Sequence, residues 1–158
     1  MIVYLDTEFT GFRDPHLISA GLICGDQELY FEVAGISLDL CTPFVVENVL
    51  PFLSGNGLSP TEISANMATF LAQCGPEVTF LCDAPRYDVA LIKPFIPATL
   101  RWHYSVPTFP TEVQFDAFTE ELQFELDTLR QHHALDDARA LAKIWRKFHP
   151  HLKALPQH

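Results

Sequence analysis

A short apolar segment that ends in two closely spaced acids constrains the fold of this chain most. Residues 2–5, Ile-Val-Tyr-Leu, favour β-structure and predict a buried strand over residues 2–8. Asp6 and Glu8 are two positions apart, so on a strand their carboxylates point to the same face. Two carboxylates this close repel each other, and burying them is costly without a counter-charge. The pair therefore predicts a divalent-cation site. The alternative is a surface strand end with two solvated acids.

The surroundings of these acids favour Mg²⁺ or Mn²⁺ over zinc. No Cys or His stands beside the pair in the sequence, and hard cations prefer oxygen ligands. The four cysteines are scattered and form no CxxC pair, which favours reduced thiols in a cytoplasmic protein over a zinc ribbon or a disulfide scaffold.

Length and charge narrow the class of protein. A chain of 158 residues with 48% apolar and 19% charged residues is typical of one globular domain, which we expect over residues 1–150, with a loose tail at 151–158. No apolar run approaches the length of a membrane span, so no membrane partner is expected. A net charge of −10 argues against a protein that coats nucleic acid with a basic surface. It does not exclude a nuclease, because bound metal ions neutralise an acidic centre locally.

Strand and helix signals alternate along the chain. Ser59, Pro60 and Glu62 form a clear helix start, with the serine as N-cap, and Gly25-Asp26 marks a tight hairpin turn. These signals predict a mixed sheet with helices on both faces, in the α/β class. The predicted strands are 2–8, 17–24, 28–33, 78–82 and 100–106, and the predicted helices are 43–53, 60–73, 87–95, 119–130 and 134–148.

The last predicted helix carries a second group of chemically active residues. Its apolar residues fall on one broad stripe, with Asp137 at the edge of the stripe and in the first turn, where the helix dipole favours an anion. Asp136 falls on the opposite side near Lys143, so we expect it to be solvated. His132 precedes the helix on a loop, from which it can reach a site that the helix helps to build. The alternative is a structural or solvent-exposed histidine.

A third group follows the fourth predicted strand. Asp83 is expected at the strand end and Asp88 at the start of the next helix, and ligand groups in open sheets commonly lie beyond such strand ends. The alternatives are a turn or N-cap role for Asp83 and a favourable first-turn charge for Asp88.

Together the three groups resemble the motifs of the DEDDh 3′–5′ exonucleases, a family that includes polymerase proofreading subunits, ribonuclease T and TREX-type enzymes. The first motif is similar to residues 6–11, Asp-Thr-Glu-Phe-Thr-Gly, and the second to residues 86–88, Arg-Tyr-Asp. The third is similar to His132-x-Ala-Leu-x-Asp137-Ala. The family's catalytic histidine stands five residues before the last aspartate, which selects His132, whereas its tyrosine variant uses the position of His133. Many members have Asn where Asp83 stands, so this position departs from the family pattern.

The resemblance implies a ribonuclease H-like fold with a mixed five-stranded sheet flanked by helices, and two Mg²⁺ or Mn²⁺ ions that clamp the scissile phosphate. By similarity, Asp6 would bridge both ions, Glu8 and Asp137 would hold the ion that activates water, and Asp88 would help to position the other. His132 would take the proton of the water as general base.

The resemblance also implies a nucleic-acid partner, cleaved from its 3′ end to nucleoside 5′-monophosphates. Gly11 would let the backbone approach the terminal sugar, and Phe12 would stack on or wedge against a base, with ordinary core packing as the alternative. The implied substrate-binding positions are Thr7, Phe9, Thr10, Gly11, Phe12 and Tyr87.

Several alternatives stay open. The few basic residues favour short or single-stranded 3′ ends over long duplex, but the choice between RNA and DNA is undecided. The oligomeric state is undecided too, although members of the family are often dimers. A different class of function is a catalytically inert binding module for nucleic acid or protein that retains the fold. The clustered acids argue against it, because a pure binder has no physical need for them.

Overall fold

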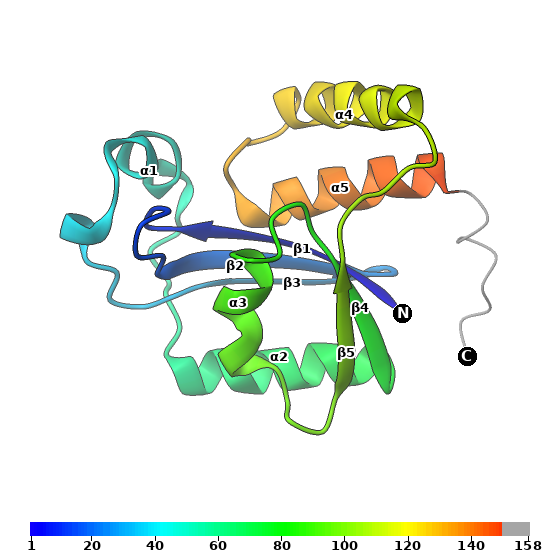
Figure 1. Ribbon diagram of the computed structural model, residues 1–158. Helices are drawn as coiled ribbons and strands as arrows, with labels where there is room; N and C mark the ends of the chain where they lie inside the picture. The colour runs from blue at the N-terminus through cyan, green and yellow to red at the C-terminus, as the bar shows by residue number, and fades with distance from the viewer. Residues whose placement is uncertain (150–158) are drawn as a thin grey trace.

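The computed structural model describes residues 1–149. Its centre is a five-stranded sheet with the strand order β3-β2-β1-β4-β5 (Figure 1). The strands are β1 (Ile2–Phe9), β2 (Leu17–Cys24), β3 (Gln27–Glu32), β4 (Glu77–Leu81) and β5 (Arg101–Ser105). The α/β class and the mixed sheet are therefore confirmed. The predicted tail, residues 151–158, lies outside the described residues.

The first three strands form an antiparallel meander, and the last two run parallel to β1. Gly25, in the tight turn between β2 and β3, has a φ of 59°, a conformation that glycine adopts without steric cost. The strand β4 pairs with β1 only as far as Tyr4, which lies opposite Leu81. Residues 6–8 therefore extend past the end of β4 and pair on one side only, with β2.

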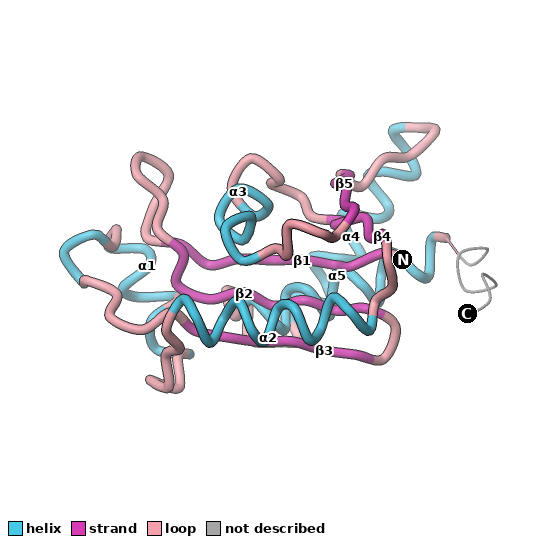
Figure 2. The backbone as a smooth tube through the Cα atoms, turned by 90° about the horizontal axis from the view of Figure 1, so that it is seen from below, coloured by secondary structure: helices cyan, strands magenta, loops and turns pink. Residues whose placement is uncertain are grey.

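Helices cover both faces of the sheet (Figures 1 and 2). On one face, α2 packs on an apolar core built from Val3, Leu5 and Phe80. On the other face, α5 packs on Tyr4 and Ile23, and α4 lies outside α5. The helices are α1 (Pro43–Asn48), α2 (Pro60–Gln73), α3 (Asp88–Ile92), α4 (Glu112–Asp127) and α5 (Ala134–Phe148), with short 3₁₀ turns at Leu38–Leu40, Leu50–Phe52 and Lys93–Phe95.

Two helix predictions are confirmed in detail and one is wrong at its start. The Ser59 side chain accepts from Glu62 N and the Glu62 side chain accepts from Ser59 N, which completes the predicted capping box of α2. The range of α5 agrees with its prediction at both ends. In contrast, α4 begins at Glu112 and not at residue 119, because Thr111 caps it by accepting a hydrogen bond from Gln114 N. Its first turn exposes Val113, so no apolar stripe marked this start.

Two predicted helices, 43–53 and 87–95, are each divided into an α-helix followed by a 3₁₀ turn. Among residues 1–149, none of the helices combines the length and the apolar character that crossing a membrane requires.

Candidate functional site

The predicted pair of acids lies on the face of β1 that α5 covers. Tyr4, on the same face by alternation, belongs to the core beneath α5, whereas Val3 and Leu5 belong to the opposite core. Burial raises the pKa of Asp6 well above its usual range, and the charges of Glu8 and Asp88 raise it further. Burial, together with the charges of Asp137 and Asp88, raises the pKa of Glu8 to about 8. The geometry agrees: ligand atoms of Glu8 and Asp137 lie within 4.8 Å of each other, and Asp6 and Asp137 line one pocket.

Asp88 reaches this group from the first position of α3 and is itself buried. Its Oδ1 accepts from the Thr7 hydroxyl at 2.7 Å, and its Oδ2 accepts from Ala84 N at 3.2 Å. Burial raises the pKa of Asp88 to about 7, a rise to which the Asp83 charge adds and which the Thr7 bond opposes. Thr7 is buried, and by alternation its side chain lies on the opposite face of β1 from Glu8. Its hydroxyl orients the Asp88 carboxylate.

The N-terminal end of α5 supplies the remaining acid and the histidine. The Oδ2 atom of Asp137 accepts from His132 N at 3.0 Å, whereas its buried Oδ1 has no hydrogen-bond partner among the described residues. Burial raises the pKa of Asp137 to about 7, opposed by the bond from His132 and assisted by the charge of Asp136. The imidazole of His132 packs edge-on against Phe44 with ring centroids 4.9 Å apart, and burial lowers its pKa.

Ligand atoms of Glu8, His132 and Asp137 all lie within 4.8 Å of one another. Within residues 1–149, this is the one group of three or more His, Cys, Asp or Glu side chains with that spacing. The orphaned Oδ1 of Asp137 needs a donor or a cation, because an unpaired buried oxygen is costly. The donor set, two carboxylates and one imidazole with two further acids beside them, fits a divalent cation.

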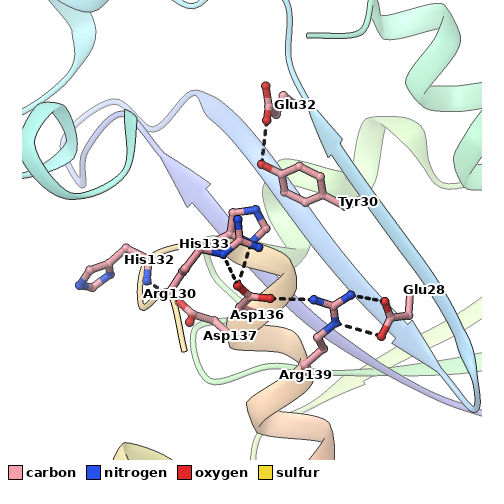
Figure 3. A network of polar contacts seen from close by, with 9 residues as sticks. All are labelled: Glu28, Tyr30, Glu32, Arg130, His132, His133, Asp136, Asp137 and Arg139. Atoms are coloured by element: carbon pink, nitrogen blue, oxygen red, sulfur yellow. Dashed lines mark hydrogen bonds and ion pairs between the residues drawn. The ribbon is translucent and has the colours of Figure 1, made fainter. Parts of the chain in front are cut away.

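Asp136 does not lie where the sequence analysis expected it. Its side chain is 6% exposed and not solvated, because two arginines neutralise it. Arg130 Nε donates to Oδ2 and Arg139 Nη1 donates to Oδ1, each at 2.7 Å (Figure 3). His133 is also buried, and its ring stacks on Tyr30 with centroids 4.7 Å apart. The His132 ring therefore lies against Phe44, whereas the adjacent His133 ring lies against Tyr30.

The predicted substrate-binding aromatic residues form one cluster beside the acids. Phe9 stacks on Tyr87 with centroids 5.1 Å apart, and Phe12 meets both rings edge-on. Phe12 is 74% exposed, so core packing, the alternative for this residue, is excluded. An exposed ring held by two partly buried ones is suited to contact a planar ligand.

Thr10 and Gly11 shape the loop that presents Phe12. Thr10 is fully buried; its hydroxyl donates to Asp14 O and accepts from His16 N. Thr10 O accepts from Thr42 N, and a β-carbon on Gly11 would come within 2.7 Å of the Thr42 side chain. These contacts give Thr10 a role in the loop's conformation and explain a small residue at position 11.

Sequence reasoning missed one wall of the site. A pocket of about 460 Å³ is lined by Asp6, Asp83 and Asp137 together with mostly apolar residues. Most of the latter come from α4 and the segment before it: Val106, Pro107, Phe115, Phe118, Thr119 and Leu122, with Leu141 from α5. The start of α4 was predicted too late to include Phe115 and Phe118, and no local signal places α4 over the acids.

The structure thus brings Asp6, Glu8, Asp88, His132 and Asp137 together from three separate segments. Neither the protein-family models nor the curated proteins compared with this sequence give a match. The resemblance to the exonuclease family therefore stays an expectation, and the functional proposal depends on the geometry of these residues.

Proposed function

We propose that this protein is a metal-dependent 3′–5′ exonuclease that shortens single-stranded or short RNA or DNA and releases nucleoside 5′-monophosphates. The observation that carries the proposal is the approach of Glu8, His132 and Asp137 to within 4.8 Å, with the buried Oδ1 of Asp137 unpaired. Burying a carboxylate is costly unless a cation or hydrogen-bond donors compensate its charge, as the two arginines do for Asp136. Among residues 1–149, no arginine or lysine forms a salt bridge with Asp6, Glu8, Asp88 or Asp137.

Asp6, Glu8, Asp88 and Asp137 would hold two Mg²⁺ or Mn²⁺ ions. When bound, such a pair supplies Lewis-acid stabilisation of the charge on the attacking and leaving oxygens of a phosphodiester. The support for oxygen-preferring ions is the carboxylate majority of the donor set. Burial raises the pKa values of Asp6 and Glu8 most, and repulsion from the neighbouring carboxylates raises them further, which is the environment that a bound cation would relieve.

His132 would act as the general base. Burial lowers its pKa, so the imidazole is neutral at pH 7 and can accept a proton from the attacking water. Its backbone N–H donates to Asp137, which ties the base to one of the acids that would hold metal. Phe44 packs edge-on with the His132 ring.

The aromatic cluster of Phe9, Phe12 and Tyr87 would receive the terminal nucleotide. Stacking on the exposed Phe12 ring does not depend on base identity, because every base has a π-face. The net charge of −10 supports short or single-stranded ends, since a long duplex needs many basic contacts to phosphate.

The sheet gives independent support. An antiparallel meander followed by two strands parallel to β1, with helices on both faces, agrees with the ribonuclease H-like fold that the motif resemblance implies. In such a sheet, residues beyond the ends of adjacent parallel strands share one edge.

The test is hydrolysis of matched 5′-labelled RNA and DNA oligomers with Mg²⁺, with Mn²⁺ and in excess EDTA. We expect no product in EDTA and recovery with either ion, because the acids have no other means of activating water. Metal-induced thermal stabilisation, measured in parallel, should be smaller in Asp137→Asn. A protein that binds no metal and cleaves neither oligomer would be an inert module instead.

A further inference from the structure

The turn that carries His132 has an uncommon backbone conformation. His133 N donates to Arg130 O at 3.1 Å, so residues 130–133 form a four-residue turn with His132 in the third position. The φ angle of His132 is 67°, in the left-handed region that Gly or Asn usually occupies in such turns. A bulky residue keeps this conformation only where its surroundings fix it.

Asp136 holds the first residue of this turn. Its buried carboxylate accepts from Arg130 Nε at 2.7 Å through one oxygen and from Arg139 Nη1 through the other. Arg139 continues to Glu28 of β3, to which it donates through Nε and Nη2. A row of four charged side chains thus runs from the edge strand of the sheet to the turn (Figure 3).

His133 holds the last residue of the turn. Its ring stacks on Tyr30 of β3, and its backbone carbonyl accepts from Asp136 N at 2.8 Å. Both ends of the turn are therefore fixed to α5 and β3. The ring of His132, between them, points away from His133 and Tyr30 (Figure 3). It lies against Phe44, and one of its nitrogens lies within 4.8 Å of ligand atoms of Glu8 and Asp137.

We propose that Arg130 is a positioning residue, whose ion pair with Asp136 fixes the turn that presents His132 to the acids. The kinetic part of this inference rests on the proposed function, whereas the part concerning the turn does not. A charge-assisted bond to a buried carboxylate is strong and directional, and Arg130 Nε is the side-chain contact from the turn to Asp136 that meets hydrogen-bond geometry. Arg139 remains as a partner of Asp136 when Arg130 is removed, so the carboxylate is not left uncompensated.

The test compares Arg130→Met with Arg139→Met as a matched control, since both remove one arginine from the same carboxylate. In Arg130→Met, we expect amide exchange of His132 about 10-fold faster or more, because the turn opens without its anchor. We expect kcat about 10-fold lower or more, with KM within about 3-fold of wild type. In Arg139→Met, both the exchange rate and kcat should stay within about 3-fold of wild type while the melting temperature falls. Arg130→Lys should recover part of the loss.

A double-mutant cycle separates positioning from a general loss of structure. In the His132→Ala background, Arg130→Met should change kcat less than about 2-fold, because Arg130 acts through the missing imidazole. Losses that multiply, or an unchanged His132 amide in Arg130→Met, would overturn the inference. If the wild-type protein hydrolyses no nucleic acid with metal present, the proposed function fails, and amide exchange alone still decides whether Arg130 fixes the turn.

Discussion

Gly21 of β2 and Ala134 of α5 approach each other so closely that no other residue type fits at position 21. A β-carbon on Gly21 would lie 2.3 Å from Ala134 O and 2.4 Å from Leu135 Cα. Gly21 also pairs directly with Asp6 across the sheet. This single close approach therefore sets the separation between the acids on β1 and the residues at the start of α5.

We predict that Gly21→Ala displaces the start of α5. The rise in activation free energy, obtained from kcat, should exceed the loss in the free energy of unfolding. The added methyl meets backbone atoms that cannot rotate away, and overpacking of this kind costs about 1–3 kcal/mol. A shift of about 1 Å at the site costs roughly 10²-fold in rate. The measurement is kcat on a labelled oligomer together with the melting temperature. Gly57→Ala is the matched control, because its β-carbon would meet Ala34 backbone at 2.6 Å and not α5. Equal kcat in both variants would contradict the prediction.

The parts of the site that the sequence predicted are those whose signals are local. Asp6 and Glu8 follow from alternation on one strand, and His132 and Asp137 follow from their spacing around one helix start. The amphipathic pattern and the capping box defined α5 and α2 for the same reason.

The parts that the sequence did not predict depend on partners far along the chain. Asp136 was expected to be solvated from its position on the helix alone. In the structure it is buried, because Arg130 and Arg139 pair with its carboxylate and Glu28 pairs with Arg139. Gly21 looks ordinary within its strand, and its role appears only when α5 packs on β2. A helical wheel of α5 shows neither the distant charged partners of Asp136 nor the packing of α5 on Gly21.

We predict that the metal-free protein loses stability as pH rises from 7 to 8.5. Glu8, with a pKa of about 8, and Asp88 and Asp137, with pKa values of about 7, retain protons that the unfolded chain has released, so the free energy of unfolding falls as pH rises through these values. Burial lowers the pKa of His132 and His133, which has the opposite effect, but that effect is confined to pH below about 6.5, where the unfolded imidazoles titrate.

Thermal unfolding in EDTA across this range measures the effect. Stabilisation by Mg²⁺ or Mn²⁺ should grow over the same interval, because metal and protons compete for the same oxygens. Asp137→Asn should reduce both dependences, because it removes one of the three titrating acids. A melting temperature in EDTA that does not fall between pH 7 and 8.5 would show that these acids are already ionised in the native protein.

We predict that the proposed hydrolysis needs a free 3′ end. A 5′-labelled single strand should be shortened stepwise, whereas a circular single strand of the same composition should stay intact, because the Thr10–Gly11 loop and the Phe12 ring are suited to a terminal nucleotide. Phe12→Ala should raise KM about 5-fold or more, the scale of one lost base–aromatic stack. Because Phe12 is exposed, the melting temperature of the Phe12→Ala variant should differ little from that of the wild type. Efficient cleavage of the circle would reveal an endonuclease and would reassign the loop.

We predict that His132 contributes mainly to catalysis and that its neighbour His133 contributes mainly to stability. His132→Ala should lower kcat about 10²-fold or more, the usual scale for a lost general base, and leave metal-induced stabilisation largely intact. His133→Ala should affect kcat much less and lower the melting temperature more, because His133 is buried and stacks on Tyr30. Asp137→Asn should differ from both by weakening metal binding itself, since it removes a charge from the group whose ligand atoms lie within 4.8 Å. Steady-state kinetics and Mn²⁺ titrations followed by thermal unfolding distinguish the three variants. If His133→Ala proves the more damaging to kcat while His132→Ala stays near wild type, the general base belongs at position 133, and the imidazole beside Glu8 and Asp137 serves another purpose.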